Sequence, residues 1–468
     1  MNKKNTNLKY KILLSVMIIA GILLMIAVGA GGAESFLADK MLAPTKENIF
    51  FIVVLCLLPV LLVTLGLILI QKRRRQKAED EAALAQARAR AALRQAMGTP
   101  NKKEEEEEKE SRFFMLSQTD EKMKKRGEIA YDKIASLKEL CERFRNFAAN
   151  RLGLFYEPSD IRQFISGLAV SHILVMQGMS GTGKTSLAYA FGEFLQNKST
   201  IVPIQPMWKE RTDLIGYYNE FTKKFNETVL LQKMYEANYS EELFITVLDE
   251  MNIARVEYYF AEFLSLLEIP NPEGRYLDVV TDKKPKDPKL LKNGQLKLPT
   301  NMWFIGTANN DDSTFAISDK VYDRAMIMNL DKKSNWFDAP YTEGIKLSVK
   351  RWERLVKRAT AEYKLTHRNK KRIGKLDEYM IEHFHISFGN RIMKQINCYV
   401  PVMIACGGNE IEAIDDILAK KVLRKLETQN PIYVRNSAEG LKNFLDELFG
   451  RDKMVKCKAY LTHLERNA

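Results

Sequence analysis

Apolar residues follow several distinct patterns along this chain, and the first of them predicts a membrane anchor. Two long apolar runs lie at residues 12–30 and 49–70, and each is long enough to cross about 30 Å of hydrocarbon. Basic residues are concentrated at the outer ends of the pair, which predicts cytoplasmic termini and a short loop on the opposite side. We expect residues 1–75 to form this two-span anchor. A signal peptide in place of the first span, or a buried soluble hairpin, are the alternatives.

Residues 76–114 are predicted to form a helical stalk and a charged linker. Good helix formers dominate 76–97, Gly98-Thr99-Pro100 ends that stretch, and an acidic run occupies 104–108. Farther on, apolar residues recur at helical spacing within 115–152, which predicts one or two amphipathic helices. The residues that carry this spacing are Leu137, Leu140, Phe144 and Phe147.

Short apolar runs then alternate with helical stretches, which is typical of a doubly wound α/β fold. The runs that predict buried strands are 171–177, 199–204, 243–248 and 302–307. Alternation of this kind favours a mainly parallel sheet with helices on both faces, and we assign it to residues 115–345. From about Ser348 onward the strand pattern disappears, so 346–468 is expected to form a C-terminal helical lid and further helices.

Composition adds a limited amount to this picture. The chain has 468 residues, 46% hydrophobic and 28% charged, so it is long enough for several domains with cores of their own. Five cysteines and five histidines are scattered without metal-ligand spacing, which indicates reduced thiols rather than a disulfide framework. The net charge of +13 is compatible with nucleic acid or an anionic membrane surface as a partner. Because many basic residues lie beside the predicted spans, where they can contact anionic lipid, the net charge is a weaker indication of nucleic acid.

A phosphate-binding loop follows the first predicted strand of the α/β region. Gly178 to Thr185 fit G-x-x-x-x-G-K-[ST], and a helix is predicted directly after them. The glycines let backbone N–H groups point at phosphate, and the helix N-terminus adds positive charge. Lys184 is expected to reach the phosphates and the Thr185 hydroxyl to hold Mg²⁺. The residues predicted to bind nucleotide here are Gly178, Met179, Ser180, Gly181, Thr182, Gly183, Lys184, Thr185 and Ser186.

Three further stretches complete a candidate hydrolytic site. The strand 243–248 ends in Asp249 and Glu250, where Asp249 is predicted to support Mg²⁺ and Glu250 to activate the attacking water. The strand 302–307 leads to Asn309, whose amide is suited to position that water. Arg324 follows in a charged loop, and its planar guanidinium suits phosphate. Taken singly, an Asn or Arg at such a place is more often a turn or salt-bridge residue.

Together these stretches resemble the AAA+ ATPases, most closely the dynein-related and MoxR-like branch, which includes the motor subunit of methylation-dependent restriction systems. Asp249-Glu250-Met251-Asn252-Ile253-Ala254 is similar to the Asp-Glu-x-Asn-x-Ala motif of that branch. Asp213-Leu214-Ile215-Gly216 is similar to its Asp-Leu-x-Gly segment. The resemblance covers about 155–330 strongly, the C-terminal helices weakly, and the first 150 or so residues not at all.

The resemblance implies roles for three polar residues. Asn309 takes the sensor-1 place, and Arg324 takes the place of the arginine finger that reaches the neighbouring subunit's nucleotide. Arg391, in Phe388-Gly389-Asn390-Arg391, matches the sensor-2 arginine of the lid, with a salt-bridging helix residue as the alternative. A finger that acts across subunits implies a ring or at least a dimer, and family members are usually hexamers. The sensor stretch departs from that of the GTP-using restriction motor, so ATP is favoured over GTP.

These features favour a membrane-anchored AAA+ ATPase that uses ATP and Mg²⁺ to remodel or translocate an unidentified protein partner. One alternative is a nucleic-acid motor of a defence system that works with a separate nuclease, and nucleic acid is the less favoured partner. Another is a nucleotide-switched membrane scaffold, although a scaffold does not need a water-activating acid such as Glu250. Aromatic residues at Trp208, Tyr217 and Tyr218 are compatible with a substrate grip or with ordinary packing.

Overall fold

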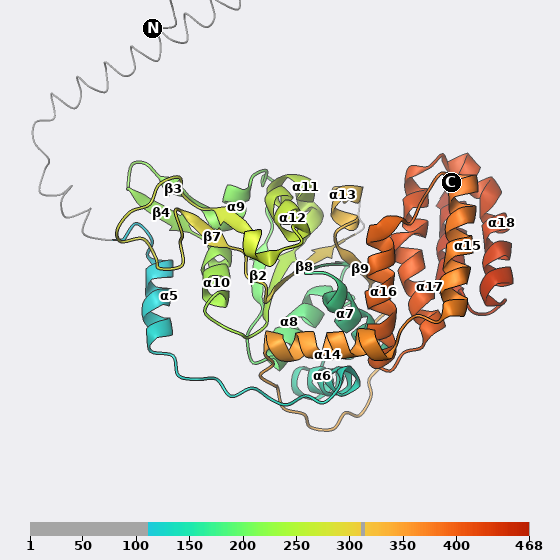
Figure 1. The fold of residues 1–468 in the computed structure, drawn as a ribbon, viewed down its shortest axis with the longest axis horizontal. Helices are drawn as coiled ribbons and strands as arrows, with labels where there is room; N and C mark the ends of the chain where they lie inside the picture. Colours follow the sequence, from blue (N-terminus) through green and yellow to red (C-terminus); the bar gives the residue numbers. More distant parts are fainter. Residues whose placement is uncertain (1–110, 310–313, 468) are drawn as a thin grey trace, which may run out of the picture. The chain divides into compact units, whose positions relative to one another are not determined.

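A five-stranded parallel sheet forms the centre of the part of the chain that the computed structural model describes, residues 111–309 and 314–467 (Figure 1). The strands lie in the order β2-β5-β8-β1-β9, and every pairing between them is parallel. Their bounds are β1 Ile173–Gln177, β2 Thr200–Pro203, β5 Phe244–Asp249, β8 Met302–Ala308 and β9 Met326–Asn329. The four predicted strands are confirmed, and β9 was not predicted. The order places β8 between β1 and β5, so the ends of these three strands meet.

Both faces of this sheet are buried, as expected for a doubly wound fold. Along β1, Leu174 and Met176 belong to one core, whereas Ile173 and Val175 belong to the other. The first core includes helices α6 (Leu137–Leu152), α7 (Pro158–Val170) and α8 (Lys184–Phe194). The second includes α5 (Met115–Lys124), α9 (Arg211–Ile215), α10 (Val229–Ala237), α11 (Val256–Tyr259) and α12 (Ala261–Glu268). The α/β prediction is therefore correct.

The helix α6 illustrates how local sequence fixes an element here. The Ser136 side chain caps its N-terminus by accepting a hydrogen bond from Glu139 N, and Gly153 ends it in the left-handed conformation. Leu137, Leu140 and Phe144 lie on one face and are at most 2% exposed. The helical spacing predicted within 115–152 thus gives two separate helices, α5 and α6.

Two small hairpins on the second face were not predicted as strands. They are β3 (Gly216–Asn219) with β4 (Lys224–Glu227), and β6 (Tyr276–Asp278) with β7 (Gln295–Lys297). Arg112 lies between them: its guanidinium donates to Asp282 Oδ1 at 2.7 Å and to both Asp287 oxygens at 2.8 and 2.9 Å. Its carbonyl accepts from Phe225 N at 2.8 Å. Packing of the α/β domain thus begins at Arg112, slightly before the predicted boundary at 115.

From Ser348 the chain is helical, as predicted. The helices are α14 (Val349–Glu362), α15 (His367–Phe384), α16 (Gly389–Ala405), α17 (Glu410–Lys421), η3 (Leu423–Thr428), α18 (Pro431–Phe449) and α19 (Val455–Asn467). Helix α16 lies against α7 and α14 (Figure 1). Apolar residues of these helices share one core with α6, α7 and α8, so the lid packs on the same side of the sheet as the helix that follows the phosphate loop.

The predicted membrane spans, stalk and acidic linker fall before residue 111 and lie outside the described residues. Within residues 111–309 and 314–467, no helix is long and apolar enough to cross a bilayer. The two-span anchor and its orientation therefore stay predictions.

Candidate functional site

The phosphate loop connects β1 to α8 as its sequence predicts. Gly178, Gly181 and Gly183 have positive φ angles of 142°, 76° and 94°, a region that residues with a Cβ rarely adopt. Gly178 is also a place of close approach, because a Cβ built there would lie 2.3 Å from Leu330 O. Met179, Ser180 and Gly181 are exposed, so the loop is open to a ligand on its outer side. Thr182 is buried, and Ser186 lies half-buried in the first turn of α8.

Lys184 is the first residue of α8 and folds back over the loop. Its ammonium donates hydrogen bonds to Gly178 O and Met179 O, both at 2.8 Å. Burial lowers the pKa of Lys184, and the carboxylates of Asp331 and Asp249 oppose that shift. The ammonium therefore rests on backbone carbonyls that phosphate oxygens are able to replace.

A cluster of hydroxyls and acids lies beside the loop at the ends of β5 and β8. Thr185 Oγ1 donates to Asp249 Oδ1 at 2.7 Å, and Thr307 Oγ1 donates to the same oxygen at 2.8 Å. The Thr307 hydroxyl in turn accepts a hydrogen bond from Glu250 N at 2.9 Å. The structure thus brings together the two predicted metal-binding residues, Thr185 and Asp249. A hydroxyl beside a carboxylate is a donor set that suits Mg²⁺.

Glu250 follows Asp249 with a backbone conformation that is unusual for its residue type. Its φ is 51°, in the left-handed region, which costs energy for a residue with a side chain and is often found at functional sites. The hydrogen bond from its N–H to Thr307 helps to hold this turn. As a result the carboxylate of Glu250 is exposed, while Asp249 stays next to Thr185.

Asn309 lies at the end of β8, next to the start of the phosphate loop. Asn252 Nδ2 donates to Asn309 O at 2.9 Å and to Phe315 O at 3.3 Å. Asn309, Asn252 and Gly178 line the same cleft. The Asn of the Asp-Glu-x-Asn motif therefore ties the segment after the acids to the predicted sensor residue.

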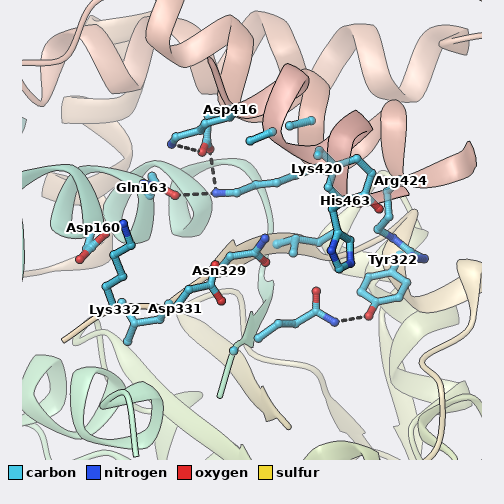
Figure 2. A pocket seen from close by; sticks show the side chains of 18 of the residues that line it. Asp160, Gln163, Tyr322, Asn329, Asp331, Lys332, Asp416, Lys420, Arg424 and His463 are labelled. Atoms are coloured by element: carbon cyan, nitrogen blue, oxygen red, sulfur yellow. Dashed lines mark hydrogen bonds and ion pairs between the residues drawn. The ribbon is translucent and has the colours of Figure 1, made fainter. Parts of the chain in front are cut away.

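A cleft of about 1390 Å³ opens from the phosphate loop toward the lid. The core contributes Asp160 and Asn329, and the lid contributes Lys420 and His463 (Figure 2). Gln177 lines the core side as well. Such a concave space between two structural parts, with several convergent polar groups, is typical of a ligand site. The cleft begins where the phosphates are expected and is roomy enough for the rest of a nucleotide.

Lys420, on α17, anchors the lid side of this cleft. Its ammonium donates to Gln163 Oε1 at 2.6 Å and to Asp416 Oδ2 at 2.8 Å (Figure 2). Asp416 also pairs with Lys456 at 2.5 Å. Burial lowers the pKa of Lys420, and Asp416 opposes that shift. Sequence reasoning did not find these cleft residues, because lysines and acids at helical spacing are usually solvated.

The two predicted arginines meet at a single carboxylate. Arg324 donates to Glu268 Oε2 at 2.6 Å and to Lys320 O at 2.6 Å. Arg391, at the head of α16, pairs with the other oxygen of Glu268. In this structure Arg391 is therefore a salt-bridging helix residue outside the cleft lining, and Arg324 points at α12. Their predicted roles toward nucleotide stay predictions.

Comparison with known proteins gives one informative match. Residues 173–325 match the family model of the AAA domain of the dynein-related subfamily, a span that runs from β1 to the residue after Arg324. A search of curated proteins finds no match. Among solved structures, a candidate ATPase from Cytophaga hutchinsonii aligns with 13% identity and a TM-score of 0.42, covering 71% of this chain and 95% of that one. A full-length MCM homolog from Methanopyrus kandleri aligns with 11% identity and a TM-score of 0.32, covering 65% and 59%.

The family match covers the phosphate loop, the acid pair and the polar residue at the end of β8. It agrees with the geometry at the phosphate loop and at Asp249, where Thr185 and Thr307 donate to the same carboxylate oxygen. The chain therefore contains an AAA domain, binds nucleotide and is an ATP-hydrolysing enzyme.

Proposed function

We propose that the chain is a membrane-anchored AAA+ ATPase that works as a ring and uses ATP to remodel or translocate a protein partner. The observation that carries the hydrolytic part is the hydrogen-bonded cluster of Thr185, Asp249, Thr307 and Glu250 beside the phosphate loop. A site that only bound nucleotide would need the loop but not an exposed acid held in a left-handed turn next to it.

The binding half of the reaction falls to the loop and the helix after it. Backbone N–H groups of the loop and the N-terminus of α8 attract the phosphates. Lys184 exchanges its bonds to Gly178 and Met179 carbonyls for bonds to phosphate oxygens. Thr185 and Asp249 would hold Mg²⁺, which would supply charge stabilisation for the phosphoryl group.

Water activation falls to the residues at the ends of β5 and β8. Glu250 is exposed and forms no ion pair within the described part of the chain, so its carboxylate is available to orient and deprotonate water. Asn309 lies on the neighbouring strand end, where its amide supports the same water. The hydrogen bond from Glu250 N–H to the Thr307 hydroxyl holds the backbone of Glu250 beside the phosphate site.

The ring follows from Arg324, which in our proposal acts on the site of a neighbouring subunit. Arg324 and the phosphate loop belong to separate segments, and the guanidinium is occupied by Glu268 within its own chain. Its side chain is 23% exposed, so exchange of Glu268 for a neighbour's phosphate is sterically accessible. Hexamers are the expected assembly of this family.

The membrane part rests on the apolar runs 12–30 and 49–70 alone. If both span, the ATPase site and the C-terminus lie in the cytoplasm, where ATP is present. Fractionation of cells tests this directly: the full chain should stay in the membrane pellet after alkaline carbonate washing. Release into the supernatant would exclude the anchor without affecting the ATPase assignment.

The hydrolytic part is tested by Glu250→Gln in the full purified chain. This variant should bind ATP with unchanged affinity and lose turnover by about 100-fold or more, since a water-activating base is removed. The matched control is Glu241→Gln, because Glu241 lies just before the opposite end of β5 and pairs with Lys350. Wild-type turnover in Glu250→Gln would show that another group activates the water.

A subunit-mixing experiment tests the ring. Arg324→Ala subunits keep their own phosphate loop, and Lys184→Ala subunits keep their arginine. Each homogeneous preparation should be inactive, whereas a mixture should regain activity because a Lys184→Ala subunit supplies its arginine to an intact site. Absence of any gain across all mixing ratios would exclude action across subunits.

A further inference from the structure

The lid helix α17 reaches across to the backbone segment that carries Arg324. Lys421, the last residue of α17, is only 5% exposed. Its ammonium donates to Tyr322 O, to Ala325 O at 2.8 Å and to Asp323 O at 3.4 Å. These carbonyls surround Arg324 in sequence. Two of them, from Tyr322 and Asp323, lie at the C-terminal end of the short helix α13 (Asp319–Tyr322). A buried cation at that end helps to satisfy the terminal carbonyls and complements the helix dipole. Asp323 O also accepts from Gln395 Nε2 at 3.3 Å.

Arg424, in η3 directly after α17, holds the same helix from its other side. Its guanidinium lies 3.3 Å from the centroid of the Tyr322 ring and donates to Asp319 Oδ1 at 2.8 Å. The Arg424 side chain is 13% exposed and Tyr322 is buried, so the contact between guanidinium and ring is largely shielded from water, which strengthens a cation–π contact. Lys421 and Arg424 together contact both ends of α13, and we call these contacts the lid clasp.

The lid clasp borders the nucleotide site, because Tyr322 and Arg424 line the same cleft (Figure 2). The Tyr322 hydroxyl accepts a hydrogen bond from the side chain of Gln177, the residue just before Gly178 of the phosphate loop. Lys420, the neighbour of Lys421 on α17, lines the nucleotide cleft (Figure 2). One helix therefore carries a lysine that faces the cleft and, next to it, a lysine that holds the Arg324 segment. A movement of α17 against the cleft must also move the clasp.

From this geometry we infer that Lys421 and Arg424 are positioning residues for Arg324: they fix the backbone from which the arginine reaches a neighbouring site. The inference rests on the proposed function, since it concerns an arginine that acts across subunits. It goes beyond that function by assigning the lid of each subunit a task in the active site next door. Arg324 itself is tethered at its tip by Glu268, so its base and its tip are held by different elements.

Loss of the clasp should impair catalysis more than nucleotide binding. Misplacement of a catalytic group by about 1 Å can cost about 100-fold in rate. We therefore expect Lys421→Met to lower kcat by about 10- to 100-fold while its KM for ATP changes less than about threefold. Lys421→Arg, which keeps a cation at the carbonyls, should recover part of the loss. The matched control is Lys394→Met, because Lys394 is an exposed lysine on lid helix α16.

Subunit mixing with the full chain decides whether the clasp serves the neighbour. Lys421→Met subunits have an intact phosphate loop but a misplaced arginine. They should regain activity when mixed with Lys184→Ala subunits, which lack a working site and keep the arginine. They should gain nothing when mixed with Arg324→Ala subunits. Restoration by Arg324→Ala and not by Lys184→Ala would overturn the inference, because Lys421 would then support its own site.

Two further measurements separate this result from other failures. A mixture of Arg324→Ala and Lys184→Ala that gains no activity rejects the arginine acting across subunits, and the inference falls with it. A gain in that mixture but none for Lys421→Met with Lys184→Ala rejects the clasp alone. If the thermal melt shows that Lys421→Met is unfolded, Asp319→Asn replaces it. The Asp319 side chain is 53% exposed, and this substitution removes only its ion pair with Arg424. It should give the same mixing pattern with a smaller loss, and wild-type activity would count against the clasp.

Discussion

Thr307 offers the sharpest test of the hydrolytic site, because one hydroxyl organises both acids. It is 3% exposed, donates to Asp249 Oδ1 at 2.8 Å and accepts from Glu250 N at 2.9 Å. Thr307→Val keeps the shape of the side chain and removes both bonds. Asp249 keeps its bond from Thr185, so the metal-binding pair survives, whereas the N–H of Glu250 loses its partner.

The size of the effect follows from the kinds of bond that are lost. A hydrogen bond to a charged carboxylate contributes about 1.5–3 kcal/mol, and one between neutral groups about 1 kcal/mol. Valine recovers part of this through apolar burial, so we expect the free energy of unfolding to fall by about 2 kcal/mol. Without the hydrogen bond from Glu250 N–H, the turn at Glu250 becomes more mobile. We expect this to lower kcat by about 10- to 100-fold, equivalent to roughly 1.4–2.7 kcal/mol in the activation free energy.

The assay combines denaturant unfolding with steady-state ATPase kinetics on the full chain. Thr246→Val is the matched control, since Thr246 lies on the adjacent strand β5, is 0% exposed, and has a hydroxyl without a hydrogen-bond partner. The same substitution there removes no bond and should be neutral or stabilising. Equal kcat values for the two variants would refute the idea that Thr307 holds the acids, whatever the change in stability.

Three other outcomes follow from the structure. Gly178→Ala should abolish binding of a fluorescent ATP analogue, because the added Cβ would lie 2.3 Å from Leu330 O at a φ of 142°; retained binding would show that the loop relaxes. Arg112→Met should lower the melting temperature, with a loss of about 3 kcal/mol, since it leaves the buried carboxylate of Asp287 without its charged partner; an unchanged melt would contradict that account. Burial lowers the pKa of Lys421 to about 7. The unfolded lysine stays protonated up to its ordinary pKa of 10.5, so stability should rise as pH increases from 7 to 10.5. In Lys421→Met the increase in stability between pH 7 and 10.5 should be smaller, as measured by urea unfolding across that range. An increase equal to that of the wild type would show that other groups cause it.

Much of the α/β core was predictable because its signals are local. Four strands are confirmed to within about two residues, since each is a short continuous apolar run bounded by polar residues. The fifth, β9, was missed because Met326–Asn329 is short and follows a charged loop. The two hairpins were missed for a related reason: their strands are three or four residues long and partly exposed.

The candidate site divides in the same way. Lys184, Thr185, Asp249 and Glu250 were predicted from contiguous motifs, and the structure places Thr185 and Lys184 beside Asp249. Thr307 was not singled out, since a threonine in a buried strand has no distinctive pattern. For Arg391 the motif was visible but its partner was not: a short motif at the start of a helix did not reveal that Glu268 lies within reach.

By itself, the sequence determined that a phosphate loop lies between a strand and a helix, and that two acids end a second strand. These residues are recognised because each motif is contiguous in the chain, so no contact between distant residues was needed to identify them. Only the tertiary structure decided that Thr307 joins the acids, that Glu268 receives both arginines, and that Lys421 holds the Arg324 segment. Lys420 and Lys421 look like ordinary solvated charges at a helix C-terminus. They differ only because α17 packs against two separate parts of the core, and such contacts between distant residues leave no periodic signal in the chain.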